Sequence, residues 1–107
     1  MIAPFSIVRP ATAELPIVVE VPHAGVHLDP ETLGYTIAPA YAVGRDADLY
    51  VDRIFEGTPR VGANLLASRI SRFVIDKNRA EDDYDSATVI GGPDRPRPRG
   101  LVWRTST

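Results

Sequence analysis

The apolar positions of the chain fall into short runs separated by turn-forming residues, and the clearest run covers residues 17–21. Four of these five residues are β-branched, and the run lies between Pro16 and Pro22. Proline is tolerated at strand margins, and a run that is apolar on both faces is typical of a strand buried between layers. Residues 17–21 are therefore predicted to form such a strand.

Three further segments are β-prone, namely residues 60–68, 72–76 and 101–107. Each concentrates apolar residues in a short stretch that begins or ends at polar or turn-forming residues. Residues 24–40 are punctuated by Gly and Pro and are predicted to be a loop. Residues 77–87 are polar, and the proline-rich residues 91–100 are predicted to be a turn or an extended segment.

One amphipathic helix is predicted, over residues 46–56. Asp46 can cap its N-terminus, and Gly57 can end it. Apolar residues recur along it at i and i+4, and Asp48 and Asp52 share a strip beside that apolar face.

These elements predict an α/β fold in which a mixed sheet is flanked by helices. A chain of 107 residues supports one domain at most. One helix cannot cover both faces of a sheet of three or four strands. Residues 1–107 are therefore interpreted as the N-terminal part of a single larger domain, and the uncovered sheet is expected to make the isolated chain self-associate.

Composition narrows the classes of function. The formal net charge of −2 gives no electrostatic reason to expect nucleic acid or an anionic membrane as partner. The sequence contains no cysteine, so a metal would need His, Asp or Glu ligands. No run approaches the roughly 18 apolar residues of a membrane span, and the first ten residues do not match a secretory signal. We expect a cytoplasmic protein.

His23 is the first candidate site residue, because it follows a predicted strand and is held between Pro22 and Gly25. It could be a metal ligand, since ligands collect at the carboxyl ends of strands in α/β sheets and neutral imidazole suits zinc. It could equally be a turn histidine whose ring nitrogens are satisfied by backbone groups. For His27 the structural interpretation is favoured, because nothing in the sequence fixes its geometry.

Two other groups carry candidate chemistry. Asp48 and Asp52 could reach a metal from the predicted helix, although most helix carboxylates are simply solvated. Polar residues bracket the apolar residues 73–75 and could hold a carboxylate substrate, because an arginine guanidinium can donate two parallel hydrogen bonds to a carboxylate. The alternative for these arginines is an ion-pair network with Asp76 at the edge of the sheet. Trp103 is interpreted as a core residue.

Four segments together resemble the N-formylglutamate amidohydrolase family: PIVVEVPHAG, DADLYVDRIF, GANLLASRISRFVIDKNR and GLVWRTST, in that order and with similar spacing. The resemblance begins at about Leu15, and SR-x-x-x-D-x-NR is its most specific part. It implies a fold like that of zinc carboxypeptidases, with a mixed sheet, helices on both sides and the metal at strand ends. It also implies hydrolysis of a small N-formyl amino acid, N-formyl-L-glutamate, to glutamate and formate in histidine degradation.

The resemblance further implies that His23 binds Zn²⁺ or another divalent metal. Asp48 is its implied carboxylate partner, with Asp52 as the alternative. The residues implied to hold substrate carboxylates are Arg72, Asn78 and Arg79.

The sequence departs from this pattern at two places. Zinc carboxypeptidases carry a Glu ligand three residues after the first His, where this chain has Val26, and Lys77 replaces a usual hydrophobic residue. A third metal ligand and the general base are expected beyond Thr107, so the 107-residue chain is expected to be inactive alone and to bind zinc weakly. Two alternatives stay open: a non-catalytic module that binds small carboxylates, and a hydrolase of another N-acyl amino acid.

Overall fold

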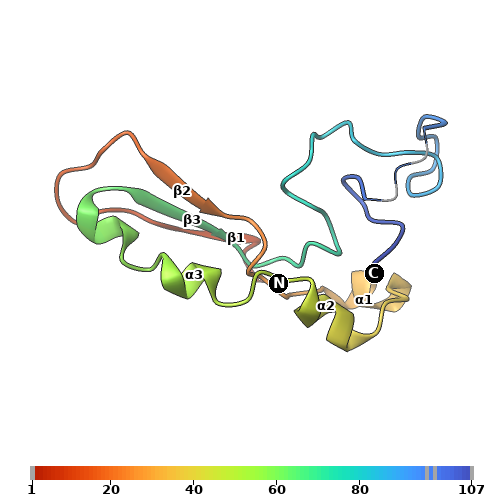
Figure 1. The fold of residues 1–107 in the computed structure, drawn as a ribbon, viewed down its shortest axis with the longest axis horizontal. Coiled ribbons are helices and arrows are strands. Elements are labelled where there is room, and N and C mark those ends of the chain that lie inside the picture. Colours follow the sequence, from red (N-terminus) through yellow and green to blue (C-terminus); the bar gives the residue numbers. More distant parts are fainter. Residues whose placement is uncertain (1, 96, 98, 107) are drawn as a thin grey trace.

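Three short strands form a mixed sheet in the computed structural model, which describes residues 2–95, 97 and 99–106 (Figure 1). The strands are β1 (Phe5–Val8), β2 (Val18–Val21) and β3 (Asn64–Ser68). Their order is β1-β3-β2, with β3 antiparallel to β1 and parallel to β2. The predicted α/β class with a mixed sheet is confirmed at this level, as are the predicted strands at β2 and β3.

The register of the sheet separates a packed face from an open one. Leu65 pairs with Val19 on the face that also holds Val21, and both Leu65 and Val21 are buried. The opposite face carries Ile7 and Val18, and Val18 is 64% exposed. The strand predicted over residues 17–21 is therefore buried on one face only in the described part of the chain, and its open face matches the expectation that residues 1–107 leave part of the sheet uncovered.

Two helices lie beyond the end of the sheet, α1 (Pro30–Tyr35) and α2 (Ala40–Arg45) (Figure 1). The loop predicted over residues 24–40 is wrong where α1 forms. The Asp29 side chain accepts a hydrogen bond from the Thr32 backbone N–H at 2.9 Å, and proline occupies the first turn. Asp-Pro at a helix start is a known signal, because the carboxylate caps the free N–H groups and proline needs no N–H there.

The helix predicted over residues 46–56 is mostly wrong. Only α3 (Val51–Ile54) is helical there, followed by the 3-10 turn η1 (Thr58–Val61). Asp46 ends α2 instead of capping a new helix, and the Asp48 backbone N–H donates to the His23 carbonyl at 2.9 Å. Tyr50 has a φ of 66°, a left-handed conformation that an α-helix cannot contain.

The strands predicted over residues 72–76 and 101–107 are also wrong within the described residues, where both segments form turns, bends and one isolated bridge between Arg99 and Trp103. The Ser71 hydroxyl accepts the Phe73 N–H at 3.1 Å, which turns the backbone away from a ladder. The Asp76 N–H donates to the Leu101 carbonyl at 2.8 Å and joins the two segments.

In the described ranges, every helix is too short or too polar to cross a membrane.

Gly25 allows the turn after β2 to lie against the end of β3 and the residue that follows it. A Cβ on Gly25 would lie 2.5 Å from the Ser68 carbonyl oxygen and closer still to the Arg69 carbonyl group. Because backbone atoms cannot yield, Gly25→Ala is expected to destabilise the full-length protein by about 1–3 kcal/mol in chemical denaturation. Gly34→Ala is the matched control: no atom lies within 4 Å of its Cβ, and alanine in α1 should stabilise by about 0.5–1 kcal/mol. Equal stability of the two variants would contradict the close approach.

Candidate active site

The parallel pairing of β2 and β3 brings two distant segments together. Parallel strands end at the same edge of a sheet, so the residue after Val21 and the residues after Ser68 leave the sheet side by side. The turn after β2 carries His23, and the segment after β3 carries the dense polar patch of residues 71–79. The site is therefore a direct product of the sheet topology.

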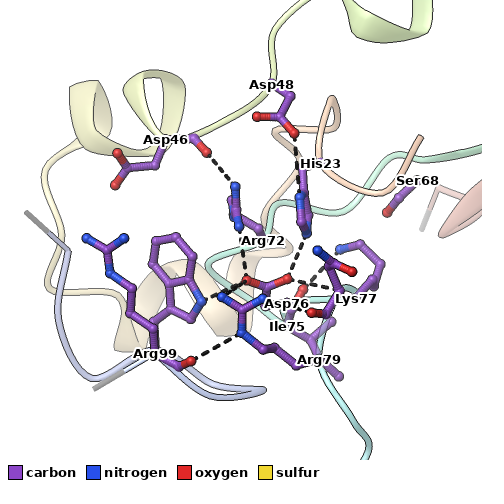
Figure 2. A network of polar contacts seen from close by, with 12 residues as sticks. His23, Asp46, Asp48, Ser68, Arg72, Ile75, Asp76, Lys77, Arg79 and Arg99 are labelled. Atoms are coloured by element: carbon purple, nitrogen blue, oxygen red, sulfur yellow. Dashed lines mark hydrogen bonds and ion pairs between the residues drawn. The ribbon is translucent and has the colours of Figure 1, made fainter. Parts of the chain in front are cut away.

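The His23 ring lies between two carboxylates (Figure 2). Its Nε2 atom is 2.7 Å from Asp76 Oδ1, and its Nδ1 atom is 3.6 Å from Asp48 Oδ2. His23 is only 4% exposed, and its carbonyl accepts the Asp48 backbone N–H. Both the ring and the backbone of His23 are thus held by residues that lie far from it in the sequence.

Asp76 is the centre of the network and is 0% exposed. Its Oδ1 accepts from His23 and from the Asn78 backbone N–H at 3.0 Å. Its Oδ2 accepts from Arg72 Nη2 at 3.1 Å and from Trp103 Nε1 at 2.9 Å. Burial alone would raise the pKa of Asp76, but the hydrogen bonds from Asn78, Arg72 and His23 outweigh it and lower the pKa to about 2.

An ionised Asp76 decides which tautomer a neutral His23 ring adopts. A carboxylate can only accept, so Nε2 carries the proton and donates it to Asp76 Oδ1. The lone pair of Nδ1 is then directed toward the side where Asp48 lies. A carboxylate that fixes the tautomer and orientation of a histidine is the usual support of a metal-ligating imidazole.

The donor atoms of His23 and Asp48 suit one divalent cation. Two ligand atoms of a tetrahedral zinc ion, each about 2.0–2.2 Å from the metal, lie roughly 3.3–3.5 Å apart. The separation of 3.6 Å between Nδ1 and Oδ2 is close to this, and the Asp48 side chain is 53% exposed and can adjust. Within the described residues, no group of three or more His, Asp or Glu side chains is arranged to hold a metal ion. His23 and Asp48 are therefore two candidate ligands, and the described residues place no third beside them.

Arg72 is packed inside the network (Figure 2). Its Nη2 donates to Asp76, its Nη1 donates to the Asp46 carbonyl at 3.3 Å, and its side chain is 16% exposed. Its guanidinium lies over the Trp103 ring at 4.6 Å, and its Nε has no hydrogen-bond partner in the described structure. The ion-pair network named as the alternative for these arginines exists, and Arg72 is part of it.

Arg79 and Asn78 lie at the outer side of Asp76. Arg79 Nε donates to the Arg99 carbonyl at 3.2 Å, and its Nη1 donates to the Asn78 carbonyl at 2.8 Å. Its Nη2 is 3.9 Å from Asp76 Oδ2, so the guanidinium is held in one orientation from three sides. Asn78 is exposed and donates its backbone N–H to Asp76.

The two remaining sequence candidates lie elsewhere. Asp52 is in the first turn of α3 and lines an open depression together with Gly25 and His27. The His27 backbone pairs with the segment after β3, through its N–H to the Arg69 carbonyl at 3.0 Å and its carbonyl to the Ser71 N–H at 2.9 Å. These backbone contacts match the structural interpretation of His27.

Sequence reasoning misses the roles of Asp76 and Trp103. It offers Asp76 only as an ion-pair partner of the arginines, and Trp103 only as a core residue. A partial signal for Asp76 exists, because an acidic residue shortly before Asn-Arg belongs to the most specific motif of the chain. The contact of Trp103 with Asp76 spans 27 positions, and no local pattern announces it.

Comparisons with known proteins agree on one family. The sequence model of the N-formylglutamate amidohydrolase family matches residues 15–107. N-formylglutamate deformylases from Pseudomonas aeruginosa and Pseudomonas putida are 34% identical over 83 residues and 33% identical over 78 residues. These alignments cover 75% and 70% of this chain, but only 31% and 29% of the two relatives.

A solved structure gives the same result. The crystal structure of N-formylglutamate amidohydrolase from Ralstonia eutropha JMP134 superposes with a TM-score of 0.81 at 36% sequence identity. The match covers 97% of this chain and 38% of that chain. The chain therefore spans only 29% to 38% of the length of these three proteins.

Proposed function

Since this chain belongs to the N-formylglutamate amidohydrolase family, we propose that the protein hydrolyses N-formyl-L-glutamate to L-glutamate and formate. We further propose that it depends on zinc or another divalent metal and serves histidine degradation in the cytoplasm. The observation that carries the metal proposal is the His23 ring, which Asp76 holds by Nε2 so that Nδ1 is directed toward Asp48. This is the donor geometry that a buried metal-ligating histidine needs.

In this proposal His23 and Asp48 hold the metal ion. Bound zinc supplies Lewis acidity, which polarises a carbonyl oxygen and lowers the pKa of water toward neutrality. A catalytic zinc site typically has three protein ligands. We place the third ligand, and the carboxylate that moves a proton to the leaving nitrogen, in parts of the protein outside residues 1–107.

The substrate carries two carboxylates, and we assign Arg79 and Asn78 to one of them. Arg79 lies on the outer side of Asp76 with its guanidinium orientation fixed by two backbone carbonyls, so little rotamer entropy remains to be lost on binding. Arg72 adds positive charge beneath them, although its terminal nitrogens already donate to Asp76 and to the Asp46 carbonyl. Such fixed cations would orient the substrate for attack at its formyl carbon.

The test is release of formate from N-formyl-L-glutamate by the full-length protein. Removal of metal with a chelator should abolish formate release, and added zinc should restore it. N-acetyl-L-glutamate in the same assay distinguishes a deformylase from a hydrolase of other N-acyl amino acids. Binding of formylglutamate without turnover, in protein that takes up no metal when zinc is added, would favour the non-catalytic module instead.

Arg79→Lys is expected to lower kcat/KM for N-formyl-L-glutamate roughly 10- to 150-fold, which corresponds to a loss of about 1.5–3 kcal/mol in transition-state binding. Lysine keeps the charge, but it has only three N–H groups. If two of them donate to the Arg99 and Asn78 carbonyls, one is left for the carboxylate, where arginine can offer two. Arg60→Lys is the control, because Arg60 is exposed on η1. Unchanged kcat/KM in Arg79→Lys would assign Arg79 to the structural network around Asp76.

A further inference from the structure

Trp103, the sole tryptophan of the sequence, contacts the centre of the site in two ways. Its indole N–H donates to Asp76 Oδ2 at 2.9 Å. Its ring also lies under the Arg72 guanidinium, with 4.6 Å between the guanidinium carbon and the ring centroid. Arg72 donates to the same Asp76 oxygen, so both donors to Oδ2 depend on the position of this one ring.

The orientation of the Asp76 carboxylate needs such donors. The terminal torsion of an aspartate side chain is broad and roughly two-fold, so packing alone does not decide which oxygen faces which neighbour. Here the two pairs of donors are divided between the oxygens: Asn78 and His23 at Oδ1, and Arg72 and Trp103 at Oδ2. Losing a donor at Oδ2 loosens the carboxylate and, with it, the bond to His23 Nε2.

We propose that Trp103 is a positioning residue of this site: its indole N–H, with Arg72 stacked on its ring, orients Asp76 so that His23 keeps its Nε2–H tautomer and presents Nδ1 toward Asp48. The indole is a rigid single donor that cannot accept, so it enforces an accepting oxygen at Asp76. The ring makes a second contribution, because a cation–π contact holds the long Arg72 side chain in the orientation that reaches Oδ2.

Two substitutions separate these contributions from simple packing. Trp103→Phe keeps an aromatic face for Arg72 and removes the N–H. Phe73→Leu removes the aromatic partner of Trp103, whose ring centroid lies 5.6 Å away, and leaves the N–H in place. If Trp103→Phe prevents folding, 3-benzothienylalanine at position 103 replaces it, because this analogue has the shape of tryptophan without an N–H.

The first readout is the tautomer of His23 in the metal-free, full-length protein, measured by long-range ¹H–¹⁵N NMR with His23→Gln to assign the signals. Wild type is expected to show the Nε2–H form. Trp103→Phe should raise the population of the Nδ1–H form at least threefold, whereas Phe73→Leu should match wild type. Wild-type tautomer populations in Trp103→Phe, or an equal change in both variants, would overturn the proposal.

The second readout is zinc affinity, which rests on the proposed function. Losing a group that supports a metal-bound histidine typically costs 10–100-fold in affinity, and we expect about tenfold weaker zinc binding in Trp103→Phe. Affinity within twofold of wild type would overturn the role of Trp103 at the metal. If the wild-type protein binds no zinc, the proposed metal dependence fails, and the tautomer measurement still decides whether Trp103 positions His23.

Discussion

His23→Gln is expected to abolish zinc binding and formate release together in the full-length protein. The glutamine amide N–H can replace the Nε2–H that donates to Asp76 Oδ1, so the buried carboxylate keeps a partner. The glutamine oxygen is a much poorer zinc ligand than the imidazole Nδ1, which lies 3.6 Å from Asp48 Oδ2. Zinc affinity should fall by more than about 100-fold, because loss of a ligand exceeds the cost of losing a supporting group.

The control for this prediction is the same substitution at the other histidine of the sequence. The contacts of His27 with the segment after β3 are made by its backbone, so His27→Gln should keep both zinc and activity. Metal content is measured by atomic emission and activity by formate release, on the same preparations. Stoichiometric zinc in His23→Gln would show that the His23 ring is not a ligand.

The strands β2 and β3 could be predicted because their apolar runs are bounded by residues that end strands. The failed strand at residues 72–76 has an equally good β pattern, but the Ser71 hydroxyl binds the Phe73 N–H and the Asp76 side chain is used for His23. The contact with His23 reaches across the fold, and together with the local turn it overrides strand propensity. β1 is missed for the converse reason, since its four residues gain their ladder only from β3, about 60 positions later.

The helix predicted over residues 46–56 fails because Tyr50 turns the chain into the left-handed region, so that α3 begins only after it. The Asp48 N–H, outside any helix, donates to the His23 carbonyl. This contact holds Asp48 beside His23 Nδ1, at a distance no helical pattern could predict. α1, in contrast, has a recognisable Asp-Pro start that the glycine and proline content of its surroundings conceals.

The candidate site, like the strands and helices, could be predicted from the sequence only in part. His23, Asp48, Arg72 and Arg79 can be chosen from the sequence as residue types in suitable places. The structure brings three of them, His23, Arg72 and Arg79, around Asp76 and places Asp48 on the other side of the His23 ring. The part that could not be predicted is the direction of each side chain, which depends on contacts such as that between His23 and Asp76, 53 positions apart. The likeness to zinc carboxypeptidases, zinc itself and the cytoplasmic location stay predictions.

Asp76→Asn is expected to destabilise the protein strongly, and by more than Gly25→Ala does. An amide presents one acceptor oxygen where the carboxylate presents two. Whichever way the amide is turned, its N–H₂ must face either the Asn78 N–H or the N–H groups of Arg72 and Trp103. The substitution also leaves the positive charge of the nearly buried Arg72 without its counter-ion. Breaking a buried ion pair by removing one partner typically costs about 3–5 kcal/mol, and we expect a loss of this size.

The pH dependence of unfolding tests the same role of Asp76 as the ionised acceptor at the centre of the network. The pKa of Asp76 is lowered from 3.8 to about 2 in the folded protein, so its contribution is fully present above about pH 4 and is lost as the pH falls toward 2. In chemical denaturation of the full-length protein, the free energies of unfolding of wild type and Asp76→Asn should therefore differ widely at pH 7, and the difference should shrink below pH 4. Asp82→Asn makes the same chemical change at an exposed position and should stay within about 0.5 kcal/mol of wild type. If Asp76→Asn lowers the free energy of unfolding at pH 7 by no more than Asp82→Asn does, the view that Asp76 holds this site together is contradicted.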